Sequence, residues 1–369
     1  MARIAIAGAG PAGASAAWHL ATRGHQVVLF DRADFPRPKT CGDWITPGAV
    51  AELARLGLTR DAMRARASEL MAIRETVLVA PSGRASRMPL QPEAYCIPRL
   101  VFDAMLFRQA AAAGARFERR AIRSLGADNA SFLSEWDYVV DARGAHAGRA
   151  NAVALRAYWT VPHAALRGGD AHAVQIHTDA EFGQGYGWIF PVAADALGVR
   201  FNLGVGTLTS TRDSGRDVRD FFERFERINP VLRRWGSVAD RSRPVGCHVG
   251  LGLPENVVAS DRVLRVGDAA NVADPLTGDG IAHALMSGRL AAEAIDGAVN
   301  GSAAARWQAA YQRHVQPEVN LALRLQRLLA GATAKNAAVR GLGLMPTLRR
   351  RIHGAVFNAI SYRQALTRL

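Results

Sequence analysis

A glycine-rich turn near the N-terminus contains residues that could bind a dinucleotide. The turn, Gly8-x-Gly10-x-x-Gly13, follows a strand-like segment over 2–7, and Asp31 ends the next strand eighteen residues after Gly13. Gly8 permits a tight turn, Gly10 lets the backbone approach a pyrophosphate, and Gly13 permits close packing of helix on strand. The N-terminus of the helix then favours phosphate, and Asp31 suits a ribose diol. The turn predicts dinucleotide binding, and by itself it does not separate NAD from FAD.

A second glycine-rich segment, about 250 residues downstream, separates the two cofactors. It begins with Gly267-Asp268-Ala269 after a strand expected over 262–266, and it continues from Pro275 to Ile281. Asp268 can accept hydrogen bonds from a ribityl chain. The backbone N–H groups from Gly278 to Ile281 can face a flavin ring and stabilise the negative charge of its reduced form. The two turns together predict FAD.

The loop between Phe35 and Pro47 contains a side chain that could move a proton. A thiol such as that of Cys41 is uncharged near neutral pH and can donate a proton or tune flavin chemistry. The alternative is a small buried residue that only shapes the loop. Trp44 in the same loop could either line a pocket or pack within the loop.

Three aromatic residues could form the wall of a substrate pocket. Tyr186, Trp188 and Phe190 alternate along a strand expected over 185–192, so their side chains share one face. That face is either ordinary core or the aromatic wall of an apolar pocket. The second interpretation predicts a hydrophobic small molecule as the substrate.

In these four segments the chain resembles the FAD-dependent family of p-hydroxybenzoate hydroxylase-like monooxygenases, flavin halogenases and geranylgeranyl reductases. The segment 36–47 is similar to the flavin-proximal loop of the geranylgeranyl and menaquinone reductase branch. Gly185–Pro191 with Asn202–Gly206 is similar to that branch's substrate-cavity motif. The resemblance covers most of residues 1–330 and includes Arg99, at the start of a helix expected over 99–113.

The resemblance implies roles for individual residues. It implies that FAD is bound by Gly8, Gly10, Pro11, Ala12, Gly13, Asp31, Arg32, Lys39, Thr40, Cys41, Gly42, Arg99, Gly267, Asp268, Pro275, Gly278, Gly280 and Ile281. It implies a substrate pocket lined by Trp44, Tyr186, Trp188 and Phe190, with Cys41, Tyr186 and Trp188 as the catalytic residues.

Three departures from the family pattern leave two reactions open. Trp44 stands where the branch has glycine, Val192 stands where lysine often occurs, and Arg143 replaces the aspartate of the hydroxylases' Ala-Asp-Gly. The first reaction is reduction of a C=C bond in a hydrophobic, isoprenoid-like or natural-product substrate, with NAD(P)H or a reduced partner as electron donor. The alternative is a monooxygenase or oxidase that tailors an aromatic or polycyclic metabolite. A halogenase is disfavoured because the chain's lysines are only Lys39 and Lys335.

The elements that must position these residues predict an α/β fold. A Rossmann-like FAD-binding domain is expected from the segments 1–68, 92–150 and 246–300. Strand-like pieces without intervening helices predict a mostly antiparallel substrate domain, inserted as 69–91 and 151–245. The remainder, 301–369, is expected to be helical.

Composition excludes several classes of protein. The chain has 369 residues, of which 49% are hydrophobic and 21% charged, so it is neither disordered nor fibrous. No apolar run reaches the roughly 18 residues of a membrane span, and no signal peptide is expected. Cys41, Cys96 and Cys247 are too widely spaced for a disulfide framework or a zinc site, so no metal is predicted and a reducing cytoplasm is expected.

The net charge of +14 is mostly scattered along the chain, so nucleic-acid binding is not predicted. The exception is 332–369, which contains seven arginines and lysines and no acidic residue. This basic segment also contains apolar residues. It could therefore make a peripheral membrane contact, or it could be a solvated helix that docks on its own protein.

Overall fold

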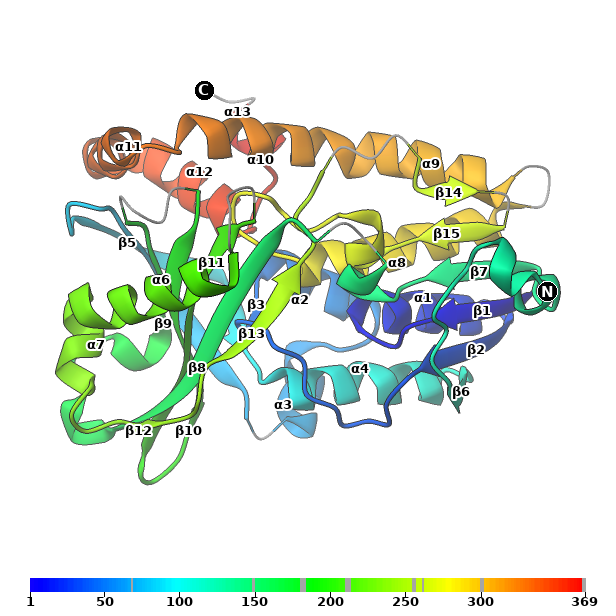
Figure 1. The fold of residues 1–369 in the computed structure, drawn as a ribbon, viewed down its shortest axis with the longest axis horizontal. Coiled ribbons are helices and arrows are strands. Elements are labelled where there is room, and N and C mark those ends of the chain that lie inside the picture. The colour runs from blue at the N-terminus through cyan, green and yellow to red at the C-terminus, as the bar shows by residue number, and fades with distance from the viewer. Residues whose placement is uncertain are drawn as a thin grey trace.

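The structure, a computed structural model, contains two β-sheets that lie next to each other, with a helical C-terminal part across them (Figure 1). It describes residues 1–67, 69–147, 150–179, 184–209, 214–253, 257–260, 262–298 and 302–366. The α/β fold class, with one Rossmann-like parallel sheet, one mostly antiparallel sheet and a helical C-terminus, is confirmed.

The first sheet has the strand order β14-β15-β7-β1-β2-β6 in the described part of the chain, and only β14 is antiparallel. Residues 4–7 are fully buried, because helices cover both faces of a parallel sheet. The strands are β1 (Arg3–Ala7), β2 (Gln26–Asp31), β6 (Arg116–Arg119), β7 (Tyr138–Asp141), β14 (Ala259–Ser260) and β15 (Val263–Arg265).

Two helices of small residues bring the distant glycine turns together. α1 (Pro11–Ala21) begins with a proline, whose fixed φ suits a first helical turn. α8 (Ile281–Asp296) crosses α1 so closely that a Cβ on Gly288 would lie 2.3 Å from the Ala12 carbonyl oxygen. The turn at Gly267 therefore lies beside the first turn, and a Cβ on Gly267 would lie 2.9 Å from the Ala12 Cβ.

The second sheet is antiparallel except where β4 pairs with β9. Its order is β12-β8-β11-β10-β9-β4-β5-β3, and β13 pairs with β8. The strands are β3 (Trp44–Ile45), β4 (Met71–Val79), β5 (Ala85–Cys96), β8 (Ala152–Pro162), β9 (Ala173–His177), β10 (Tyr186–Ala194), β11 (Gly198–Leu208), β12 (Asp240–Arg241) and β13 (Val245–Val249).

Helices cover one face of the second sheet, so its other face is available to line a site. α6 (Ser214–Ile228) and α7 (Pro230–Trp235) cover one face and contribute Phe225 and Trp235 to a core with Ile189 and Phe201. The remaining helices that precede α8 are α2 (Pro47–Arg55), α3 (Arg60–Arg66), α4 (Arg99–Ala112) and α5 (Ala130–Ser134).

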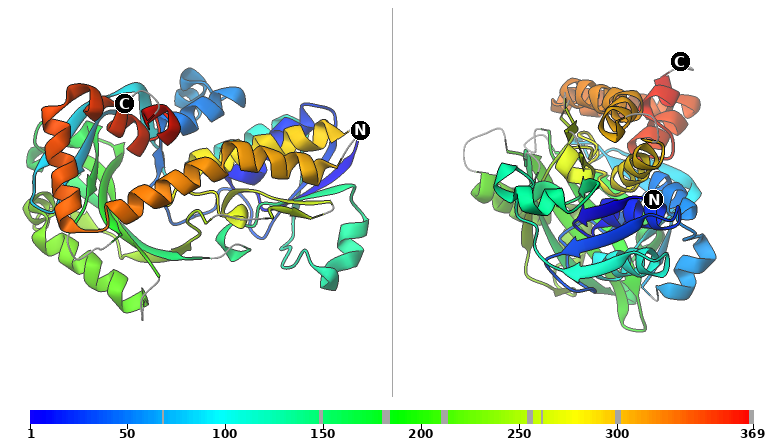
Figure 2. Two further views of the ribbon diagram at one scale, coloured as in Figure 1. Left: turned by 90° about the horizontal axis from the view of Figure 1, so that it is seen from above. Right: turned by 90° about the vertical axis from the view of Figure 1, so that its right-hand side faces the viewer.

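The C-terminal helices close over the two sheets (Figure 2). Buried His353 attaches α12 to the second sheet, because its Nδ1 and Nε2 atoms each hydrogen bond at 2.9 Å, to Thr76 and Ser86 respectively. Burial, with a smaller effect of Arg349, lowers the pKa of His353 to about 4. The helices are α9 (Ala303–His314), α10 (Gln316–Leu328), α11 (Ala332–Leu344), α12 (Pro346–Val356) and α13 (Tyr362–Leu366).

The division into domains remains a proposal, and the second sheet extends beyond the segments 69–91 and 151–245 that were expected to form it. β5 continues to Cys96, and β13 continues to Val249. β13 gives no strand pattern in the sequence because its residues are exposed or half-exposed. Residue 68, the expected end of the first segment, and Arg368 of the basic segment lie outside the described residues.

The described helices differ from membrane-spanning helices in length or in apolar character. None of them combines the length and the apolar character that crossing a bilayer requires.

Candidate active site

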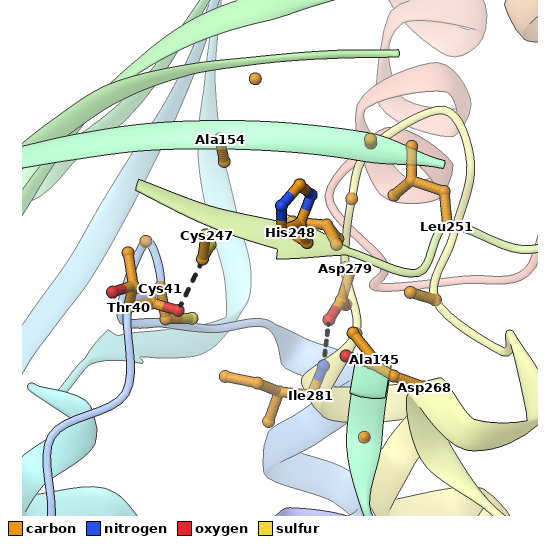
Figure 3. Close-up of a pocket in the computed structure, with 18 of the residues that line it drawn as sticks. Thr40, Cys41, Ala145, Ala154, Cys247, His248, Leu251, Asp268, Asp279 and Ile281 are labelled. Atoms are coloured by element: carbon orange, nitrogen blue, oxygen red, sulfur yellow. Dashed lines mark hydrogen bonds between the residues drawn. The ribbon is translucent and has the colours of Figure 1, made fainter. Parts of the chain in front are cut away.

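A cavity of about 1420 Å³ lies between the two sheets and extends under the C-terminal helices. Every residue predicted to bind FAD or substrate lines this cavity, except Gly13. Figure 3 shows part of the lining, where the loop with Thr40 and Cys41 faces Cys247 of β13. The fold therefore gathers the four sequence segments around one space. The role of each residue there remains a prediction.

The first glycine turn fits the pyrophosphate of FAD. Gly8 has φ +107°, and a Cβ there would lie 2.2 Å from the Ala142 carbonyl oxygen. A Cβ on Gly13 would lie 1.8 Å from the Gly8 carbonyl oxygen, so Gly13 acts through packing. A Cβ on Gly10 would meet only the Arg37 guanidinium, at 3.8 Å. The space at Gly10 is thus open to a phosphate group beside a cation.

Arg37 is a cofactor-site candidate that sequence reasoning missed. Its guanidinium contacts Asp31 at 3.2 Å and Asp103 at 3.4 Å, and it lies over the Phe35 ring at 4.8 Å. Asp31 also accepts a hydrogen bond from the Ala9 N–H at 3.0 Å, which fixes the carboxylate at the end of β2. The feature of the sequence that could have identified Arg37 was its position two residues before Lys39, which was predicted to bind FAD.

The second glycine turn presents a carboxylate to the cavity and is held by its own hydrogen bonds. Burial raises the pKa of Asp268, and the cations Lys39 and Arg99 oppose that shift. Three of the N–H groups expected to face the flavin are engaged within the turn, because Gly278 donates to the Asp274 carbonyl, Asp279 donates to the Thr277 hydroxyl and Ile281 donates to the Asp279 carboxylate. These bonds hold the turn in a defined shape, in which the Asp268 carboxylate faces the space where FAD would bind.

The aromatic residues of β10 form a continuous wall. The Tyr186 and Trp188 ring centroids lie 6.2 Å apart, and the Trp188 and Phe190 rings stack at 6.3 Å. On the paired strand β11, Gly206 lies opposite Tyr186 and Gly204 lies opposite Trp188. A Cβ on Gly204 would lie 2.4 Å from the Trp188 ring, so the glycine makes room for the indole.

The polar atoms of two predicted catalytic residues are already engaged. The Tyr186 hydroxyl donates to the Thr277 carbonyl, and burial raises the Tyr186 pKa, with further contributions from Asp274 and Asp279. The Trp188 Nε1–H donates to Asn202 at 2.9 Å. Both side chains therefore line the cavity without offering a free acid or base.

Trp44 lies at the cavity wall and packs against other elements rather than within its own loop. It lines the cavity, and its ring packs against Phe190 at 5.5 Å and Phe357 at 5.4 Å. Its Nε1–H is buried without a hydrogen-bond partner among the described residues. The tryptophan thus narrows the cavity where the second sheet meets α12.

A buried network that sequence reasoning missed connects the Cys41 loop to the aromatic wall. Asn202 is fully buried and donates to the Cys41 carbonyl at 2.6 Å and to Asp43 at 2.8 Å, while its carbonyl oxygen accepts from Trp188. Asp43 also accepts from the Tyr158 hydroxyl at 2.5 Å and from the Arg99 N–H at 3.1 Å. Burial raises the pKa of Asp43, and these hydrogen bonds oppose the shift.

This network predicts a large stability effect at Asn202. Asn202→Ala should lower the free energy of unfolding of the holoprotein by about 1–3 kcal/mol for each buried partner left unsatisfied. Urea unfolding of the variant and of the wild-type protein measures this loss of stability. Half-buried Asn129 makes one side-chain bond, to the Ser124 carbonyl, so Asn129→Ala is the control and should cost less than about 1 kcal/mol. Equal losses in the two variants would contradict the assignment.

Cys41 lies beside a buried cation. Burial lowers the pKa of the Arg99 guanidinium, but Asp103 and Cys41 together raise it above its ordinary value. Arg99 pairs with Asp103 through two bonds of 2.5 and 2.8 Å, which fixes the guanidinium next to the thiol. The Cys247 thiol lies 3.9 Å from the Thr40 carbonyl oxygen (Figure 3). The chain thus places a thiol, a fixed cation and an aromatic wall around one space.

The fold and this cavity define an FAD-dependent oxidoreductase. Residues 3–86 match the family model described as FAD dependent oxidoreductase. In three dimensions the chain is similar to a flavin-dependent brominase, Bmp2, with a TM-score of 0.79 over 96% of this chain and 93% of that one. At 19% identity this similarity shows a shared fold.

Sequence comparison narrows the class to one family. The chain is 31% identical to menaquinone reductase of Mycobacterium tuberculosis, over 79% of this chain and 76% of that protein. It is also 31% identical to digeranylgeranylglycerophospholipid reductase 1 of Methanopyrus kandleri, over 79% of each. The chain belongs to the family of FAD-dependent oxidoreductases that includes menaquinone reductase and the geranylgeranyl reductases, which confirms the resemblance in its motifs.

Proposed function

We propose that this protein reduces a C=C bond in the polyprenyl chain of a lipid-like substrate. The observation that carries the proposal is the continuity of one cavity, from the glycine turns past Cys41 to the aromatic wall. The family members named above are a menaquinone reductase and a reductase of a geranylgeranyl lipid. Both molecules carry polyprenyl chains.

Beyond the aromatic wall, the cavity suits a long apolar chain. Its far part is lined by apolar residues of the second sheet, of the second glycine-rich segment and of the C-terminal helices. These residues are Leu78, Ile176, Leu276, Leu329, Ala338, Val339 and Val356. Burying each CH₂ group of a substrate there contributes about 0.8 kcal/mol. A chain that reaches this lining from the flavin side would pass Trp44 and Phe190.

The residues of the chain have distinct tasks in the proposed reaction. Bound FAD supplies two-electron hydride chemistry. Tyr186, Trp188 and Phe190 hold the planar C=C bond and exclude water, because the polar atoms of Tyr186 and Trp188 already have partners and Phe190 has none. The Cys41 thiol donates the proton that completes the reduction, and Asn202 holds the Cys41 backbone in place. The electron donor is proposed to be NAD(P)H or a reduced partner.

Trp44 is expected to limit the length of the substrate. Trp44→Gly removes the ring from between Phe190 and Phe357 and should raise kcat/KM for longer polyprenyl chains relative to shorter ones, about tenfold. Trp44→Leu keeps part of the packing and replaces the glycine variant in the assay if the glycine variant is unstable. Assays with chains of increasing length measure the ratio. An unchanged ratio in both variants would show that Trp44 does not limit length.

The proposal is tested by identifying the product. The holoprotein is given NAD(P)H, or dithionite as a substitute for a reduced partner, with a polyprenyl quinone or a geranylgeranyl phospholipid. Mass spectrometry should show the addition of two hydrogens to the polyprenyl chain. Flavin that turns over without any change in either chain would refute the proposed substrate class.

A further inference from the structure

We propose that α11, together with the turns at its two ends, docks on the surface of an anionic lipid bilayer. Large apolar side chains are exposed at both ends of this helix. Leu328, just before it, is 70% exposed, whereas Leu344 and Met345, at its end, are 76% and 57% exposed. Exposed apolar side chains at both ends of one helix are typical of a helix that lies on a membrane surface.

The charge around these residues matches an anionic partner. After Glu318 the chain contains nine arginines and lysines and no aspartate or glutamate. Arg327, Arg340 and Arg350 are exposed and lie within five residues of these apolar residues in sequence. Cations beside exposed apolar side chains bind anionic lipid headgroups while the apolar groups enter the acyl boundary. A second copy of this chain would place the same cations opposite one another across a two-fold axis, which disfavours self-association through this face.

The inner side of α11 lines the cavity. Lys335, Ala338 and Val339 line it, and Ala338 is also exposed, so the cavity lies directly behind the proposed docking surface. Lys335 donates to the Asp179 carbonyl at 3.4 Å. A chain that leaves the bilayer beside α11 would thus reach the apolar part of the cavity without crossing bulk water.

The docking surface is held rigidly by the rest of the protein. The side-chain Oδ1 of Asn336 accepts a hydrogen bond from the Ser82 N–H in the β4–β5 turn, and His353 fixes the following helix to the same sheet. Figure 2 shows α11 and α12 at the end of the molecule far from the N-terminus. A preformed surface loses little conformational entropy on binding.

The test is co-sedimentation of the purified holoprotein with vesicles in the absence of substrate. Phosphatidylcholine vesicles that contain phosphatidylglycerol should bind the protein, and high salt should weaken binding. Arg340→Gln with Arg350→Gln should lower the partition coefficient about 25-fold, roughly fivefold for each cation. Leu344→Ser with Met345→Ser should lower it about tenfold or more.

Matched control variants show whether a loss of vesicle binding is specific to this surface or follows from removing any exposed cation or apolar side chain. Arg64→Gln with Arg108→Gln removes two exposed cations from α3 and α4, and Leu197→Ser removes an apolar side chain that is 80% exposed in the turn between β10 and β11. Neither control should change vesicle binding by more than about twofold. The proposal is wrong if the wild-type protein fails to bind anionic vesicles, or if the control variants weaken binding as much as the test variants do. It is also wrong if the wild-type protein is a dimer that does not bind vesicles and Leu344→Ser converts that dimer to monomers. Because this test measures vesicle binding and not turnover, a negative result would not contradict the proposed reaction.

Discussion

Gly10→Val yields a folded protein that carries almost no FAD. Gly10 precedes α1 with φ −72°, a conformation that valine adopts, and a Cβ there would meet only Arg37 at 3.8 Å. The valine methyl groups would instead occupy the space where the pyrophosphate approaches the backbone. We expect FAD affinity to fall roughly 100-fold or more, equivalent to about 2.7 kcal/mol. The ratio of flavin absorbance to protein absorbance in the purified variant measures how much FAD it has retained.

A second valine variant makes this result specific. Gly168→Val places the same side chain where a Cβ would have nothing within 4 Å, and this position does not line the cavity. It should retain full flavin. Circular dichroism and a thermal melt show whether each variant is folded. A folded Gly10→Val protein with a full complement of FAD would mean that the first glycine turn is not the pyrophosphate site.

Cys41→Ser keeps the fold and the flavin but slows turnover by about 10²–10⁴-fold, the usual contribution of a general acid. A hydroxyl is a much weaker acid than a thiol, yet it has nearly the same shape and can still contact Arg99. The measurement is the rate at which substrate reoxidises the anaerobically reduced holoprotein in a single turnover. Because the hydride donor is already reduced, this rate is independent of the electron donor.

Cys247→Ser is the matched control for this prediction. Cys247 lines the same cavity and lies 3.9 Å from the Thr40 carbonyl oxygen, but it is not assigned a proton. It should change the single-turnover rate by less than about threefold. Turnover by Cys41→Ser at the wild-type rate would leave Cys41 as a residue that only shapes its loop.

The sequence was most informative where local rules determine the structure. The Gly8 turn requires glycine because of its positive φ and its contact with Ala142, so the βαβ unit could be predicted from one short segment. The alternation of Tyr186, Trp188 and Phe190 predicted a shared face, and the strand β10 confirms that spacing. These features depend on neighbours along the chain, which a sequence displays directly.

Features that depend on distant contacts could not be predicted. Asp43 has φ +64° and is held by Asn202 and Tyr158, which lie more than a hundred residues away along the chain. Exposed β13 lacks hydrophobic alternation, so its pairing with β8 left no pattern to detect. The apolar far part of the cavity also needs α11 and α12, which are held on the second sheet by contacts between residues more than 250 positions apart, such as Ser82 with Asn336 and Thr76 with His353.

The most direct measurement on the proposed reaction is an anaerobic single turnover with product analysis. The holoprotein is reduced chemically, freed of excess reductant, and mixed with a polyprenyl quinone or geranylgeranyl lipid in the absence of O₂. The account predicts that flavin is reoxidised and that one C=C bond gains two hydrogens for each flavin. The contrary result is that substrate remains unchanged without O₂ and acquires an oxygen atom when O₂ is admitted, with one O₂ consumed per product, as the monooxygenase alternative requires.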